Sequence, residues 1–347
     1  METKVTVASR VIFIVFALIA FSYVARAVVL PVMLAWVVAM TLKPTVSWLA
    51  AHHLPTPLAA GIVVGIFVVL MSYAAAYLIS PAISAVKSAP QTIPQLKEKF
   101  HHVFEPFFRL SAAASKAGNI DPTEDGSKKT EVNVKDNHVA GTVFTWTGSL
   151  LAGIAETLAL IFLLLASGDF LSRKLVNVMS TTPAKKHAAE ISREIQESIS
   201  KYLFSVGLIN VGFGTAVGLT LIPTGMSNVA MWGGIAAFLN FIPYFGPVIG
   251  MILVGLGGFF AFDSIGQSLL PAGIYLALHL IEANLVTPFI LGKQFTMNPF
   301  IIFTALIFFV WLWGVIGALL AVPLLISLKI VSKHVPALSF VEEYLSP

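Results

Sequence analysis

Apolar residues follow one another along this chain in blocks whose lengths match a lipid bilayer. A helix of about 20 apolar residues crosses the hydrocarbon core, which is about 30 Å thick. Blocks that fit one crossing each occupy residues 11–25, 28–42, 58–79, 143–166, 204–222 and 270–291. The pattern predicts an all-α polytopic membrane protein with about six full spans.

Two further blocks, residues 231–262 and 300–331, are too long for a single crossing. A straight helix of that length would measure about 48 Å at 1.5 Å per residue. Each block also has an internal break, at Pro243 and Pro247 in the first and at residues 311–317 in the second. In the first block the helix cannot continue, because a proline removes a backbone donor and clashes with the preceding helical turn. We therefore expect each block to form a re-entrant helical hairpin.

The order of these elements repeats. The span 204–222 precedes the first hairpin, and the span 270–291 precedes the second in the opposite orientation. A span followed by a hairpin, used twice in opposite orientations, predicts an inverted repeat. That plan is found in secondary transporters, which place their substrates at broken helices.

Two polar stretches interrupt the apolar blocks. Residues 81–142 begin with apolar positions near helical spacing and predict an amphipathic helical arm followed by a loop. Residues 169–203 carry six basic side chains and predict an amphipathic helix at the membrane surface. The positive-inside rule puts this second stretch and both chain termini in the cytoplasm, which leaves the arm extracytoplasmic.

These elements predict a division of the chain into six parts. They are three spans in residues 1–80, the arm and loop in 81–142, a fourth span in 143–168, the cytoplasmic amphipathic helix in 169–203, a transport core in 204–331 and a cytoplasmic tail in 332–347.

Composition supports the membrane assignment and excludes several functions. Of the 347 residues 57% are hydrophobic and 11% are charged, where soluble proteins have about a quarter charged. The chain has no cysteine, which excludes disulfides and thiolate chemistry. The net charge of +4 is spread over loops, so no nucleic-acid partner is expected. Ala25-Arg26-Ala27 has the form of a signal-peptidase site, but the apolar run continues beyond it, which favours a retained first helix.

Several sequence stretches resemble the AI-2E family of bacterial transporters, also called autoinducer-2 exporters. They are residues 238–247 (FLNFIPYFGP), 282–293 (EANLVTPFILGK), 298–299 (NP), 313–323 (WGVIGALLAVP) and 163–169 (LLLASGD). The resemblance covers most of the chain from about residue 143 onward. It implies an inner-membrane permease that forms a homo-oligomer, with a pentamer as one form. Proposed family substrates include autoinducer-2, and some members are reported as cation/proton antiporters.

Glu282 is the strongest candidate for a functional residue. It lies within an apolar span, where an acid is costly unless it is paired or functional. His279 precedes it by three residues and shares its helical face, and Asn284 follows two residues later. We predict a pair that handles a proton or a cation; the alternative is a structural acid bonded to a neighbouring helix.

The first hairpin supplies a second group of candidates. Its polar and backbone groups suit a polyol or a cation, and the alternative is a turn that only caps itself. These residues are Asn240, Pro243, Tyr244, Gly246 and Pro247. The second break and two intramembrane polar residues complete the predicted path, namely Trp313, Gly314, Asn210 and Glu156. We expect both breaks and Glu282 to meet at one site.

The pattern as a whole predicts a secondary transporter that exports a small polar solute resembling autoinducer-2, with proton or cation coupling. A phosphate-binding loop, a hydrolase motif and a paired intramembrane aspartate motif are all absent from the sequence, so we expect neither an enzyme nor a bound cofactor or metal. Two alternatives stay open, a cation/proton antiporter and a membrane scaffold that binds partners through residues 81–142.

Overall fold

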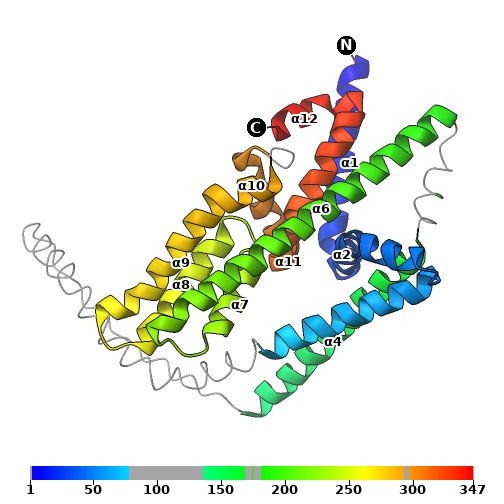
Figure 1. Ribbon diagram of the computed structural model, residues 1–347. Coiled ribbons are helices and arrows are strands. Elements are labelled where there is room, and N and C mark those ends of the chain that lie inside the picture. The colour runs from blue at the N-terminus through cyan, green and yellow to red at the C-terminus, as the bar shows by residue number, and fades with distance from the viewer. Residues whose placement is uncertain (1, 78–135, 169–173, 175–180, 293–296, 347) are drawn as a thin grey trace, which may run out of the picture.

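The computed structural model describes residues 2–77, 136–168, 174, 181–292 and 297–346, and every regular element in these ranges is helical (Figure 1). The helices are α1 (Glu2–Val24), α2 (Arg26–Ala51), the helix Thr56–Tyr77, α4 (Asp136–Ala166), α6 (Thr182–Leu221), η1 (Ile222–Thr224), α7 (Val229–Leu239), α8 (Phe245–Ala261), α9 (Ile265–Ile281), the π-helical turn η2 (Glu282–Val286), α10 (Thr287–Leu291), α11 (Pro299–His334), η4 (Pro336–Leu338) and α12 (Ser339–Leu345). The predicted all-α class is confirmed.

Five of the described helices are long and apolar enough to cross a membrane. They are Arg26–Ala51, Thr56–Tyr77, Thr182–Thr224, Ile265–Leu291 and Pro299–His334. Shorter apolar helices include α7 and α8. These lengths agree with a polytopic membrane protein, while the number of full spans stays a prediction. Residues 81–135 of the predicted arm lie outside the described residues, and residues 136–142 belong to α4.

α6 is one continuous helix of 40 residues, which is about 60 Å at 1.5 Å per residue. It begins where the Thr181 hydroxyl accepts a hydrogen bond from the Ala184 amide, with Pro183 in the first turn. It ends at Leu221, and after the short η1, which contains Pro223, the chain turns through Gly225 in a left-handed conformation (φ 80°). The interior contains no proline, so the helix continues across residue 203, where the charge pattern predicted a boundary between two elements.

α7 and α8 form the first helical hairpin and reverse the chain between Leu239 and Phe245. A Cβ at Gly246 would overlap the Leu239 carbonyl oxygen and lie 2.6 Å from its carbon, so the two helix ends approach as closely as a glycine allows. α7 packs on α6 (Figure 1) in a similar way, because a Cβ at Gly214 would lie 2.6 Å from the Ala237 Cβ. Small residues thus let α6 and α7 approach each other closely.

α11 contains a second reversal at Gly314, whose backbone is far from helical (φ 66°, ψ −148°). Leu306 before the reversal packs against Ala318 and Ala321 after it. The amide of Asn298, just before α11, donates to the Leu345 carbonyl at 3.3 Å, so the chain returns to the level from which it started. Both predicted breaks are therefore reversals between two packed helices.

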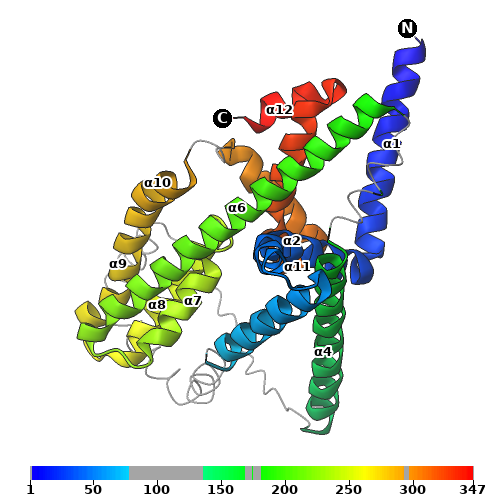
Figure 2. The same cartoon turned by 45° about the vertical axis from the view of Figure 1, so that its right-hand side comes forward.

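The N-terminal helices form a second group. α2, the helix Thr56–Tyr77 and α4 share a core of small and branched residues that includes Ala35, Ala59 and Ile161. Figure 2 shows α4 on the opposite side of α2 from α9 and α10. α2 also contacts the middle of α11, because Val37 packs with Leu312 and Trp313. α2 and α11 thereby join the two groups.

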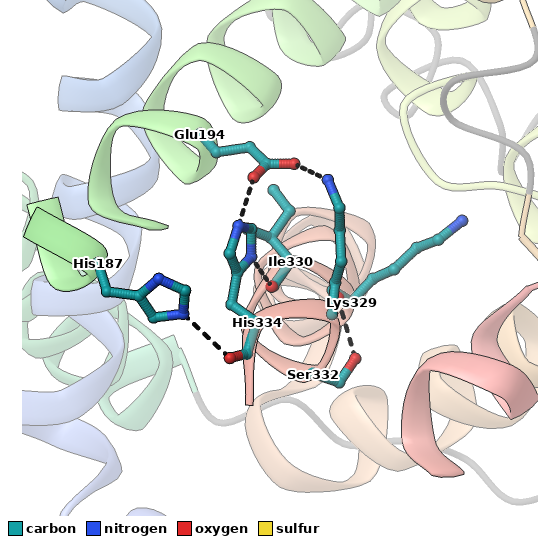
Figure 3. A network of polar contacts seen from close by, with 7 residues as sticks. His187, Glu194, Lys329, Ile330, Ser332 and His334 are labelled. Carbon is teal, nitrogen blue, oxygen red and sulfur yellow. Dashed lines mark hydrogen bonds and ion pairs between the residues drawn. The ribbon is translucent and has the colours of Figure 1, made fainter. Parts of the chain in front are cut away.

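A polar network fastens the N-terminal half of α6 to the end of α11 (Figure 3). Glu194 accepts a hydrogen bond from Lys333 Nζ at 2.9 Å, and its other oxygen lies 3.3 Å from His334 Nε2. A ring nitrogen of His187 lies 3.2 Å from the His334 carbonyl oxygen. Beside this network Ile199 packs with Ile326 and Ile330 in an apolar cluster. The polar contacts therefore extend an apolar helix–helix interface.

We expect Glu194→Gln to lower the thermal unfolding temperature of the detergent-solubilised protein slightly, because it removes the negative charge that faces both Lys333 and His334. The free energy of unfolding should fall by less than about 1 kcal/mol, since the side chains of Glu194 and Lys333 are partly exposed. Glu197→Gln is the matched control, because its ion pair with Arg193 (3.4 Å) lies within one exposed face of α6. Equal unfolding temperatures for the two variants would contradict a fastening role for Glu194.

Candidate functional site

A cavity of about 370 Å³ lies between α6, the turn of the first hairpin and the π-helical turn after α9. Seven of the residues predicted from the sequence line it, and they come from three separate segments: Asn210, Asn240, Pro243, Tyr244, Pro247, His279 and Glu282. Its volume is in the range of small-molecule sites.

The π-helical turn positions Glu282 toward this cavity. Pro288 has no amide hydrogen, and in an ordinary α-helix its ring would clash with the carbonyl of Asn284. The helix widens instead, and the Thr287 amide donates to the Glu282 carbonyl five residues earlier. Such single π-turns occur often at functional sites.

Glu282 is 8% exposed, and its carboxylate lies among polar groups from α9, α10 and the hairpin turn. The Thr287 hydroxyl donates to Oε1, and His279 Nδ1 lies 3.3 Å from Oε2. The side-chain amide of Asn240 also interacts with the carboxylate. His279 is itself held by an edge-to-face contact with the ring of Phe213 on α6, at 6.1 Å between centroids. A buried acid with these neighbours has the partners that the apolar surroundings demand.

Two asparagines connect the hairpin turn to α6. Asn240 Nδ2 donates to Asn210 Oδ1 at 2.9 Å, and Asn210 is 1% exposed. The network therefore runs from α6 through the turn to Glu282. Among the described residues no group of three or more histidine, aspartate or glutamate side chains could hold a metal ion.

The turn itself uses the backbone carbonyls that its prolines leave without their helical donors. The Leu239 carbonyl, four residues before Pro243, accepts from the Ile242 amide at 2.9 Å. The Pro243 carbonyl, four residues before Pro247, accepts from the Phe245 amide at 2.7 Å. The expectation that these carbonyls serve a ligand is thus weakened, and the side chains are the groups that the cavity offers.

Sequence comparison identifies the group of proteins to which this arrangement belongs. The model of the AI-2E family transporter matches residues 12–337, which is nearly the whole chain. The chain belongs to the AI-2E transporter family. The resemblance seen at the proline turn and at Glu282 is confirmed, and the family's transport role agrees with the expectation of a transporter rather than an enzyme.

Several curated relatives of this AI-2E transporter are themselves named as transport proteins. The chain is 28% identical over 312 residues to the AI-2 transport protein TqsA of Escherichia coli K12, covering 88% of this chain and 86% of TqsA. It is 25% identical over 319 residues to the putative transport protein YhhT of the same organism, covering 89% and 85%. The putative transport protein YrrI of Bacillus subtilis is 28% identical over 181 residues, about half of each chain. Together with the apolar helices, these relatives point to a bacterial membrane protein.

Four of the predicted site residues lie away from the cavity in this AI-2E transporter. The Trp313 indole donates to the Ser22 carbonyl on α1 at 3.3 Å, and Gly314 follows it at the reversal of α11. The Asn284 side chain is exposed and donates to the Leu280 carbonyl at 2.8 Å. Glu156 is exposed on α4, in the N-terminal group.

The expectation that both breaks and Glu282 meet at one site is therefore wrong in one part. The turn of the first hairpin contacts the middle of the second, where Tyr244 and Phe245 lie against Phe303, and Ile242 packs with Leu306. The tip of the second hairpin extends past this contact to α1 and α2. Gly246 lies in the turn but shapes the reversal rather than the cavity wall.

Thr287 and Tyr202 also line the cavity and were not predicted from the sequence. On a regular helix Thr287 would lie about 140° around the axis from Glu282, because each residue turns about 100°. Only the π-turn brings its hydroxyl to the carboxylate. Pro288 was the available signal, since a proline inside an apolar span demands a local change of helix geometry.

Proposed function

We propose that this AI-2E transporter is a secondary transporter that exports a small polar solute across the bacterial inner membrane through the cavity beside Glu282. The observation that carries the proposal is the convergence of Asn210, Asn240 and Glu282, which are far apart in the sequence, on one largely apolar cavity. Polar groups at membrane depth are expensive, and they commonly mark a substrate or ion pathway.

The helix lengths support re-entrant hairpins around this site. α7 and α8 have 11 and 17 residues, which is about 17 and 26 Å. Neither reaches the hydrocarbon thickness of about 30 Å. Their turn packs against α11 through the buried Ile242, which gives the irregular backbone a protein neighbour, as membrane depth requires. α6 with the first hairpin and α9–α10 with the second form the two units of the proposed inverted repeat, and solute access alternates as these units move.

Glu282 carries the coupling proton or cation in this mechanism. The ionised carboxylate accepts from Thr287 and pairs with His279, whereas the neutral acid gives up the ionic part of these interactions. Binding of a proton or a cation at Glu282 therefore changes how α9 is held against α6 and the hairpin turn. This change links the occupancy of the site to the conformation of the transporter.

The same carboxylate also favours a second candidate function, cation/proton antiport, in which a cation and a proton exchange at Glu282. The orientation that we propose has both termini in the cytoplasm, because the N-terminal half of α6 is rich in lysine and arginine. The extracytoplasmic arm at 81–142 and a homo-oligomer, with a pentamer as one form, belong to the same proposal. Partner binding that is lost while flux persists after deletion of 81–142 would support the scaffold alternative.

Flux into sealed proteoliposomes tests these functions directly. We expect a pH or sodium gradient to drive uptake of autoinducer-2 or another small polar solute in vesicles that contain the protein, and not in empty vesicles. Proton movement reported by an internal dye on addition of Na⁺, Li⁺ or K⁺ without a solute would favour the antiporter. Vesicles that move neither solute nor protons would contradict both functions.

A further inference from the structure

The side-chain NH₂ group of Asn210 has no partner among the described residues. Its Oδ1 accepts from Asn240 Nδ2, whereas its own Nδ2 is buried and has no hydrogen-bond acceptor among the described residues. A buried donor without an acceptor is unfavourable, so such a group calls for an explanation. Asn210 lines the cavity beside Glu282, which provides one.

The orientation of the two amides follows from the carboxylate. Ionised Glu282 can only accept hydrogen bonds, so Asn240 must direct its NH₂ group toward it. The same NH₂ group then donates to Asn210, which must present its oxygen. Rotating the Asn210 amide would bring two donors together, so its own NH₂ stays available for a ligand.

We propose that Asn210 determines specificity by donating a hydrogen bond to an oxygen of the transported solute while Glu282 accepts one from a hydroxyl of the same solute. Neighbouring donor and acceptor groups within about 370 Å³ suit a small neutral polyhydroxylated molecule. The N–H group of Asn210 cannot ligate a metal cation, which needs oxygen ligands, so this donor points to an oxygen of the solute. This inference rests on the proposed function and narrows it to one class of solute.

The test measures uptake of ribose and its 2-, 3- and 5-deoxy analogues by proteoliposomes that contain the full chain. We expect the wild type to prefer ribose to at least one deoxy analogue by about tenfold or more, because a site built to bond a hydroxyl rejects the analogue that lacks it. Asn210→Leu should bring this ratio close to one. A merely structural role for Asn210 would instead lower uptake of all four sugars by the same factor.

Asn210→Ala serves as a second variant should leucine not fit the buried position, and Asn284→Leu is the matched control because its amide lies outside the cavity. An unchanged ratio in a folded Asn210 variant would overturn the proposal. Uptake of none of these sugars by a wild type that still exchanges cations for protons would overturn the solute class and leave transport intact. The absence of any flux would contradict the proposed function itself.

Discussion

Replacement of Glu282 by glutamine is expected to abolish gradient-driven accumulation of solute and its dependence on pH. Glutamine keeps the size of the side chain and its contact with Thr287 but holds no charge, so residue 282 can no longer change its protonation state. The initial rate should fall at least about tenfold, which corresponds to about 1.4 kcal/mol on the barrier. Uptake by proteoliposomes with an imposed pH gradient, measured at several external pH values, gives both quantities.

Glu156→Gln is the matched control for this experiment, because Glu156 is also an acid in an apolar helix but lies exposed on α4. It should retain the rate and the pH profile of the wild type. Solute exchange without a gradient separates coupling from binding, and the Glu282 variant is expected to keep part of that exchange. A Glu282 variant with wild-type accumulation and pH dependence would rule out the coupling role.

The helical breaks and the central part of the site follow from rules that act over a few residues. Pro243, Pro247 and Gly246 are incompatible with a continuous helix, so the reversal of the chain could be predicted from them alone. A spacing of three residues also places His279 and Glu282 on one face of a helix. In the structure His279 Nδ1 lies 3.3 Å from Glu282 Oε2. The same geometry argues against Asn284, because two residues turn a helix by about 200°.

The remaining features depend on contacts that local rules do not reach. The layout of two similar units suggested that both hairpin tips meet. Side-chain packing, however, decides at which position the two hairpins contact each other. Ile242 fits against Leu306 and Ala318 in the middle of α11, which leaves Trp313 beside α1. Charge patterning likewise marked a boundary near residue 203, although nothing in the backbone chemistry of α6 stops the helix there.

Gly246→Ala is expected to have the largest effect of any single substitution on folding of the transport core. The added methyl group would overlap the Leu239 carbonyl oxygen and lie 2.6 Å from its carbon. Both atoms belong to the backbone, so no change of rotamer relieves the clash. Overpacking of this kind costs about 1–3 kcal/mol and sometimes more, and here it acts on the turn that carries Asn240. We expect a lower unfolding temperature and aggregation during size-exclusion chromatography in detergent.

Gly273→Ala provides the comparison, because Gly273 lies within α9 and a Cβ there would meet no atom within 4 Å. Alanine should be neutral or stabilising at that position by up to about 1 kcal/mol, since glycine is a poor helix former. The two variants add the same methyl group, so a difference between them reports the space around each glycine. If Gly246→Ala unfolded at the wild-type temperature and kept its transport rate, Gly246 could not lie as close to the Leu239 carbonyl as described. Asn240 would then lack the rigid support that its contacts with Asn210 and Glu282 require.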